Sequence, residues 1–139
     1  MRGERGFTLI EMMVVVAIIA LIAAIAIPNL RRARQVANAA SAKQSLRTIT
    51  TAQYMYERKY GVYGTLAQLA PEGTLDSVLQ TGTKSNYVFT LTATATSFSC
   101  TATPLEDPTR LEHFYVDQTS VIRFSQGSPA DSTSPPIPK

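Results

Sequence analysis

The chain has 139 residues, a length that suits one folded domain together with a short additional segment. Its net charge of +3 is mild, and no dense basic stripe with interleaved aromatic residues is present, which argues against a dedicated nucleic-acid-binding protein. The only cysteine is Cys100, so an intramolecular disulfide is excluded. We expect Cys100 to pack as a small hydrophobe on a strand, with an intermolecular disulfide as the alternative.

The chain begins with a short charged leader, residues 1–6, which is followed by a long apolar stretch. Every residue from Met12 to Ile27 is apolar, and the sequence stays uncharged up to Leu30. A helix rises about 1.5 Å per residue, so residues 7–30 could cross a hydrocarbon core about 30 Å thick. We therefore expect a transmembrane helix here; a cleaved signal peptide and the core helix of a soluble domain are the alternatives.

Glu11 is the one charged residue inside this apolar region. An ionised carboxylate at the edge or in the interior of a bilayer costs roughly a few kcal/mol unless a partner neutralises it. Glu11 is therefore the first candidate functional residue. The alternative is that Glu11 lies at the level of the lipid headgroups, solvated and without a function.

The run Gly6-Phe7-Thr8-Leu9-Ile10-Glu11 resembles the processing motif of the type IV pilin superfamily, which includes the pseudopilins of type II secretion. The likeness continues through the apolar region to Pro28. In that family a membrane aspartyl protease cuts after the glycine and methylates the new N-terminus. The resemblance implies cleavage between Gly6 and Phe7, N-methylation of Phe7, and a part in filament assembly for Phe7, Glu11 and Pro28.

The chemistry of these residues agrees with the resemblance. Cleavage before Phe7 would place a cationic amine within one helical turn of Glu11 in the same chain, or beside Glu11 of a neighbouring chain. A lone carboxylate in an apolar bundle needs such a partner, because removing one member of a buried ion pair costs about 3–5 kcal/mol.

After the apolar region, the sequence predicts that the helix continues. Pro28 lacks a backbone N–H, so we expect it to kink or loosen the helix at this point. Residues 31–59 have the apolar periodicity of an amphipathic helix, and Gly61 is a suitable residue to end it. Four tyrosines near the helix end should pack that end against a sheet; they are Tyr54, Tyr56, Tyr60 and Tyr63.

The rest of the chain predicts a short helical piece at residues 66–70, then a small antiparallel sheet. Strands are expected where Thr, Val, Phe and Tyr are abundant: residues 86–93, 97–102, 111–117 and 120–124. Residues 125–139 contain four prolines and four serines and are expected to form a flexible tail.

The expected fold class is therefore α+β, a long helix whose second half packs on an antiparallel sheet, as the resemblance to pilins implies. The expected divisions are the leader 1–6, the transmembrane helix 7–30, the globular domain 31–124 and the tail 125–139.

No catalytic constellation is recognisable, so we expect no enzyme. His113 is the only histidine and lies in an expected strand, where a structural or an exposed role is the default. Oxygen-rich loops can bind calcium, and the resemblance to major pseudopilins makes calcium an alternative to the absence of a cofactor. The candidate calcium ligands are the acidic residues on either side of His113, but their spacing matches no defined pattern of ligands. They are Glu106, Asp107, Glu112 and Asp117.

The resemblance also implies partners and a location. The partners would be further copies of this chain in a homopolymer, minor pilins, prepilin peptidase, and an inner-membrane assembly platform with its cytoplasmic ATPase. The precursor would span the inner membrane once, and the product would be a surface pilus or a periplasmic pseudopilus. Arg31, Arg32 and Arg34 follow the span, and the positive-inside rule alone would place them in the cytoplasm. We give the resemblance more weight, because the leader must meet a protease that faces the cytoplasm.

The sequence leaves two alternative functions open. Within the same family, the chain could be a major pseudopilin of type II secretion or a competence pilin. Outside it, the chain could be a membrane-anchored periplasmic binding domain that never polymerises. Such a domain should keep its N-terminus uncut and tolerate the loss of Glu11.

Overall fold

The computed structural model describes residue 3 and residues 5–138 of the chain. The chain divides into two compact units, the first ending at Val36 and the second beginning at Ala37. Helix α1, Leu9–Tyr60, runs through both units, and all the strands belong to the second. The predicted long N-terminal helix is thereby confirmed.

The first unit consists of the N-terminal part of α1 and the residues that precede it. Its large apolar side chains are exposed from Phe7 to Leu30. The helix continues without a break through Pro28. Because proline has no N–H, the carbonyl group of Ala24 lacks its usual helical donor at this position. The kink or loosening that we expect at Pro28 stays a prediction.

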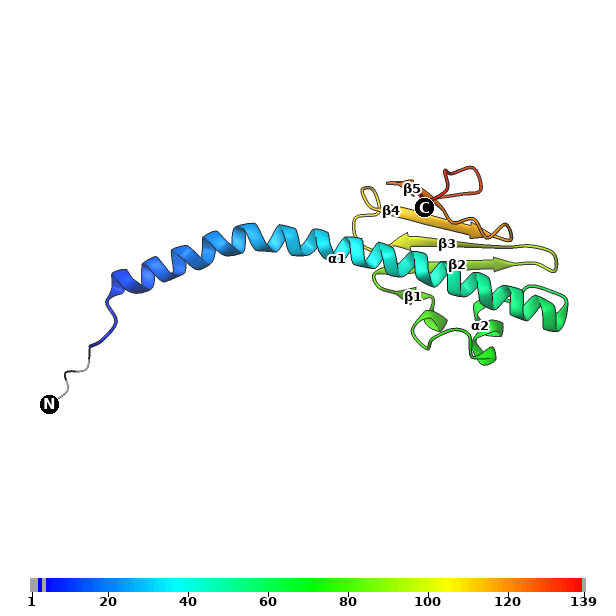
Figure 1. Cartoon of the computed structure of the whole chain (residues 1–139), viewed down its shortest axis with the longest axis horizontal. Helices are drawn as coiled ribbons and strands as arrows, with labels where there is room; N and C mark the ends of the chain where they lie inside the picture. Colours follow the sequence, from blue (N-terminus) through cyan, green and yellow to red (C-terminus); the bar gives the residue numbers. More distant parts are fainter. Residues whose placement is uncertain (1–2, 4, 139) are drawn as a thin grey trace. The chain divides into compact units, whose positions relative to one another are not determined.

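The second unit contains one antiparallel sheet of five strands, which neighbour one another in chain order (Figure 1). The strands are β1 Thr83–Lys84, β2 Tyr87–Ala93, β3 Phe98–Pro104, β4 Glu112–Asp117 and β5 Arg123–Gln126. The predicted antiparallel sheet is confirmed, and the two-residue β1 is an addition to the four predicted strands.

The last strand begins at Arg123, so its predicted start at Ser120 was wrong. The reason is the turn that precedes it. The backbone N–H of Thr119 donates to Oδ1 of Asp117 at 2.9 Å, and Ser120 has a φ of 62°, in the left-handed region that a strand does not use.

The core of the second unit lies between α1 and one face of the sheet, which we call the inner face. Along β3, buried residues alternate with half-buried ones, as expected when one face of a strand packs on a core. On α1, Ala42, Leu46 and Ile49 are fully buried at helical spacing. Cys100 is buried on the inner face, and this burial raises the pKa of its thiol to about 12. It therefore packs as a small hydrophobe, as predicted.

The segment between α1 and the sheet contains the predicted short helix, α2 Leu66–Leu69, followed by two 3-10 turns, η1 Ala70–Glu72 and η2 Leu79–Thr81. The predicted packing of tyrosines at the end of α1 is confirmed for Tyr54, Tyr56 and Tyr63. It was wrong for Tyr60, which is 50% exposed and donates from its hydroxyl group to Glu72. The ring of Phe98 lies 6.5 Å from the ring of Tyr54 and 5.1 Å from the ring of Tyr63.

The C-terminal segment packs on the second unit, so the prediction that residues 125–139 form a flexible tail was wrong. The backbone N–H of Phe124 donates to the carbonyl of Pro135 at 3.0 Å, and the N–H of Ile137 donates to the carbonyl of Ile122 at 3.0 Å. Proline cannot donate, but its carbonyl group can accept. These bonds therefore cover part of the free edge of β5, which would otherwise expose unpaired backbone groups.

Candidate functional site

The Gly6–Phe7 junction lies in an exposed, non-helical segment just before α1, and Phe7 is 82% exposed. A Cβ atom added to Gly6 would meet no other atom within 4 Å. Gly6 also does not have a positive φ. The packing and the backbone of the described residues therefore do not explain a glycine here. Residues 1, 2 and 4 of the predicted leader lie outside the described residues.

Thr8 and Glu11 together cap the N-terminus of α1. The backbone N–H and the hydroxyl of Thr8 both donate to Oε2 of Glu11, each at 2.8 Å. The backbone N–H of Glu11 donates to the hydroxyl oxygen of Thr8 at 3.3 Å. This reciprocal pattern is a capping box, and the helix dipole also favours a negative charge at this end. Our sequence reasoning missed Thr8, although Thr-x-x-Glu directly ahead of an apolar run is the signal for such a cap.

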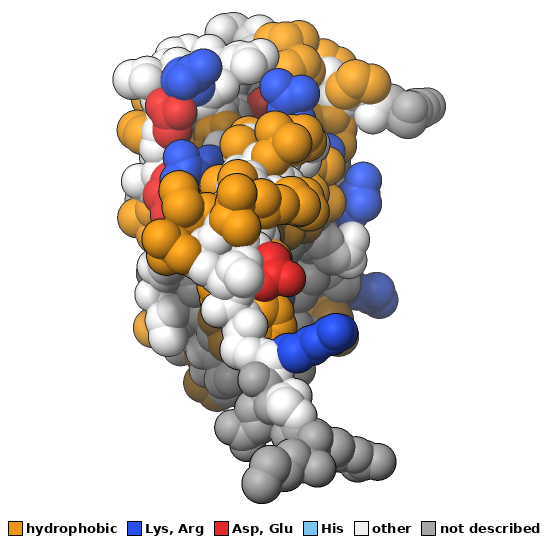
Figure 2. Space-filling view, turned by 90° about the vertical axis from the view of Figure 1, so that its left-hand side faces the viewer, with side chains coloured by type: hydrophobic (Ala, Val, Ile, Leu, Met, Phe, Trp, Pro, Cys, Tyr) orange, Lys and Arg blue, Asp and Glu red, His pale blue; other side chains and the backbone are white. Residues whose placement is uncertain are grey.

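Phe7 and Glu11 line the same shallow hollow on the first turns of α1. The hollow has a volume of about 420 Å³ and is completed by the apolar residues Ile10, Val14 and Val15. Figure 2 looks at the chain from its N-terminal side, where hydrophobic side chains (orange) cover much of the surface that faces the viewer. The capping box uses only Oε2 of Glu11. The other carboxylate oxygen can therefore accept a donor that approaches over an apolar surface.

Pro28 lies about 25 Å further along the axis of α1 than Glu11 and is not part of this hollow. Within the part of the chain that the structure describes, α1 alone is long and apolar enough to cross a membrane. None of its most apolar stretch is buried. This uncovered stretch is consistent with membrane anchoring.

The remaining candidate residues are not brought together into a second chemical centre. His113 is buried in β4, where Nε2 lies 2.7 Å from the carbonyl oxygen of Pro108. Asp107 and Asp117 interact with hydroxyl groups of their own turns. Over residue 3 and residues 5–138, no group of three or more His, Cys, Asp or Glu side chains could hold a metal ion. Calcium stays an alternative without an acidic cluster to support it among the described residues.

Comparison with known families identifies the N-terminal segment. The family described as "Prokaryotic N-terminal methylation motif" matches residues 1–27. This range includes Gly6, Phe7, Thr8 and Glu11 and ends just before Pro28. No curated protein matches the chain.

The fold agrees with this match, because a long apolar N-terminal helix and a five-stranded antiparallel sheet form a pilin-like α+β fold. Residues 1–27 thus carry a prepilin-type N-terminal methylation motif, and the helix and sheet to which they are joined have a pilin-like arrangement.

Proposed function

We propose that the chain is a structural subunit of a type IV pilus-like filament, cleaved by prepilin peptidase between Gly6 and Phe7 and polymerised through its N-terminal helix. The observation that carries this proposal is the exposed apolar surface of α1 from Phe7 to Leu30, which begins within the methylation motif. Monomeric soluble proteins rarely expose contiguous apolar patches larger than roughly a few hundred Å². Lipid can cover this surface before assembly, and the helices of neighbouring subunits can cover it afterwards.

The proposed assembly gives Glu11 a second partner. Cleavage after Gly6 creates an amine at Phe7, which is cationic near neutral pH and keeps its charge when methylated. In the filament this amine would pair with Glu11 of a neighbouring subunit, beside the apolar hollow of that subunit's first turns. Loss of either partner would leave a charge unpaired in an apolar bundle, which costs about 3–5 kcal/mol.

In this proposal the subunit is not an enzyme and needs no cofactor. It waits as a single-pass precursor in the inner membrane, where it meets the peptidase and an assembly platform driven by a cytoplasmic ATPase. Copies of the chain, with minor pilins, then join through a head-to-tail interface that does not close on itself. The product is a pilus on the cell surface or a periplasmic pseudopilus. A major pseudopilin or a competence pilin would use the same N-terminal segment, and the neighbouring genes would separate these roles.

Mass spectrometry of the assembled protein tests the proposal. The N-terminus should be Phe7 carrying one methyl group, and electron microscopy should show filaments built from this subunit. Gly6→Leu should leave the full-length precursor in the membrane. Gly3→Leu is the matched control, because a side chain at Gly3 would also meet no atom within 4 Å, so cleavage should proceed. An intact Met1 in assembled filaments would refute the proposal, and an uncut protein that forms no filament would favour a membrane-anchored binding domain.

A further inference from the structure

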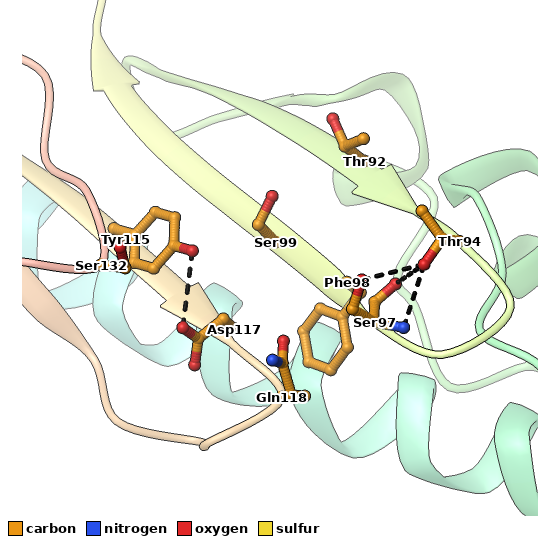
Figure 3. A pocket seen from close by; sticks show the side chains of 9 residues that line it. All are labelled: Thr92, Thr94, Ser97, Phe98, Ser99, Tyr115, Asp117, Gln118 and Ser132. Atoms are coloured by element: carbon orange, nitrogen blue, oxygen red, sulfur yellow. Dashed lines mark hydrogen bonds between the residues drawn. The ribbon is translucent and has the colours of Figure 1, made fainter.

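The outer face of the sheet, which is turned away from α1, carries a polar hollow (Figure 3). The proposed function, polymerisation through the N-terminal helix, assigns no role to this hollow. Three of its residues lie directly opposite one another on neighbouring strands: Thr92 on β2, Ser99 on β3 and Asp117 on β4. Opposed residues of antiparallel strands point to the same side of a sheet, so these polar side chains line the hollow together. Its volume of about 330 Å³ is at the small end of the range for ligand pockets, about 300–1,000 Å³.

The rim of the hollow comes from three further segments. Thr94 and Ser97 close the turn between β2 and β3, where their hydroxyl groups lie 2.9 Å apart. Gln118 follows β4, and Ser132 belongs to the C-terminal segment that is held on β5. The hollow is therefore built by residues distant in sequence, all of them in the second unit.

Of the described side chains that line the hollow, only that of Asp117 is charged, and this residue is only 9% exposed. Its Oδ1 accepts hydrogen bonds from the N–H and the hydroxyl of Thr119, at 2.9 and 2.5 Å. Among the described residues, Oδ2 receives only a long contact of 3.5 Å from the hydroxyl of Tyr115. Oδ2 therefore has room for a stronger donor, which a ligand with O–H groups would supply.

Other groups around Asp117 are also available to a ligand. Figure 3 shows no hydrogen bond from Thr92, Ser99 or Gln118 to the other residues that line the hollow. Hydroxyl and amide groups of this kind can both donate and accept. Tyr115 adds an aromatic ring, whose apolar face can pack against C–H groups while its hydroxyl stays in the polar network.

We propose that this hollow binds one ring of a neutral glycan. A sugar ring offers O–H donors to Oδ2 of Asp117, acceptors to the surrounding hydroxyl and amide groups, and C–H groups to the ring of Tyr115. Among the described residues, the lining has no cation to hold an acidic ligand, and Asp117 would repel one. A single carboxylate is also a poor site for calcium, which takes about 6–8 oxygen ligands. The inference does not depend on polymerisation, because the hollow belongs to the second unit alone.

Saturation-transfer NMR on the full chain in lipid nanodiscs tests this inference with glucose, galactose, mannose and N-acetylglucosamine as probes. Detergents with sugar headgroups are avoided because they would compete. At least one probe should receive saturation. Asp117→Asn should weaken its binding about tenfold or more, as expected when hydrogen bonds to a charged group are lost. Thr103→Ala is the matched control: it lies on the outer face of β3 but outside the hollow, so binding should be unchanged.

A second variant, Ser99→Leu, fills the hollow and leaves the bonds between Asp117 and Thr119 in place. It should abolish binding even if Asp117→Asn disturbs the fold. The inference would be overturned if none of the four sugars received saturation, or if Ser99→Leu bound as well as the natural chain. Equal binding of glucuronic acid would also overturn it, because Asp117 should repel that carboxylate. So would loss of binding on addition of a calcium chelator, since a metal ion would then hold the sugar.

Discussion

At the scale of single residues, Glu11 has one observed role and one proposed role. Its Oε2 closes the capping box with Thr8, and loss of a helix cap costs about 0.5–2 kcal/mol. In the proposed filament, its negative charge also pairs with the amine of a neighbouring Phe7. Glu11→Leu should insert into the membrane at least as well and still be cleaved, yet assemble poorly. That variant alone cannot tell the two roles apart, because it removes both.

Two further variants separate the cap from the charge. Glu11→Gln keeps an acceptor that a capping box can use but removes the charge, so we expect normal cleavage and little filament. Thr8→Val removes the capping hydroxyl but keeps the charge, so filaments should still form. Filament yield after shearing, with mass spectrometry of the cleaved subunit, measures both. Normal assembly of Glu11→Gln beside failure of Thr8→Val would mean that the cap matters and the charge does not.

Gln53 connects α1 to the loop that follows it. Its Nε2 donates to the carbonyl of Gly64 at 2.6 Å, and the N–H of Gly64 donates to its Oε1 at 2.9 Å. The side chain is fully buried. Gln53→Ala would leave both backbone groups buried without partners and should lower the free energy of unfolding by about 1–3 kcal/mol. Thermal unfolding of the full chain in nanodiscs measures this, with Gln44→Ala, an exposed position on the same helix, as the control. Equal melting temperatures for the two variants would count against the role of Gln53.

At the scale of secondary-structure elements, Pro28 is the weak point of α1. The carbonyl of Ala24 has no helical donor there, so this turn should open more readily than its neighbours. In an assembled filament we expect residues 25–29 to be the least regular part of the helix. Cryo-electron microscopy would reveal this as missing helical hydrogen bonds, and Pro28→Ala should restore them. A regular, straight helix through this segment in the natural filament would contradict the prediction.

The C-terminal segment acts as a cover for the free edge of β5. It supplies backbone partners to Phe124 and Ile122, and Arg123 donates from its guanidinium group to the carbonyl of Ser134 at 2.9 Å. Prolines in the covering segment offer few N–H groups to a further strand. An edge protected in this way does not readily pair with another chain.

Truncation of the C-terminal segment tests whether it stabilises the second unit. A chain that ends at Gln126 loses the buried Ala130 and the core contact of Ile137 and exposes the edge of β5. Its melting temperature should fall by more than about 5 °C, equivalent to roughly 1 kcal/mol for a domain of this size. A chain that ends at Ile137 keeps these contacts and should melt like the full chain. If both truncated chains melted at the same temperature as the full chain, the C-terminal segment would be a loose tail after all.

At the scale of the whole molecule, the two units differ in how much of their apolar surface is buried. The second unit closes its own hydrophobic core between α1 and the sheet. The first unit has no such core, and its large apolar side chains stay exposed. A soluble monomer would pay for this exposure in water, whereas lipid or a bundle of identical helices removes it. The same chain therefore contains a folded domain and a surface that needs partners.

The sequence alone was sufficient for the features that depend on local chemistry. Hydropathy and the isolated charge of Glu11 identified the apolar helix, and the Gly6–Phe7 junction ahead of it pointed to the methylation motif that the family match then confirmed. Periodicity also found the sheet-packing half of α1, and the abundance of Thr, Val, Phe and Tyr found the four longer strands. These patterns repeat over many residues, so single exceptions such as Pro28 did not hide them.

The tertiary structure decided the features that depend on strand register and on contacts between distant residues. Thr92, Ser99 and Asp117 became one polar row only because their strands pair in that register. Composition suggested a disordered C-terminal end, yet the segment packs because β5 offers an edge whose backbone groups need partners. The unpaired backbone groups that hold the segment are on β5, and not in the segment itself. The composition of the segment therefore could not reveal that it packs.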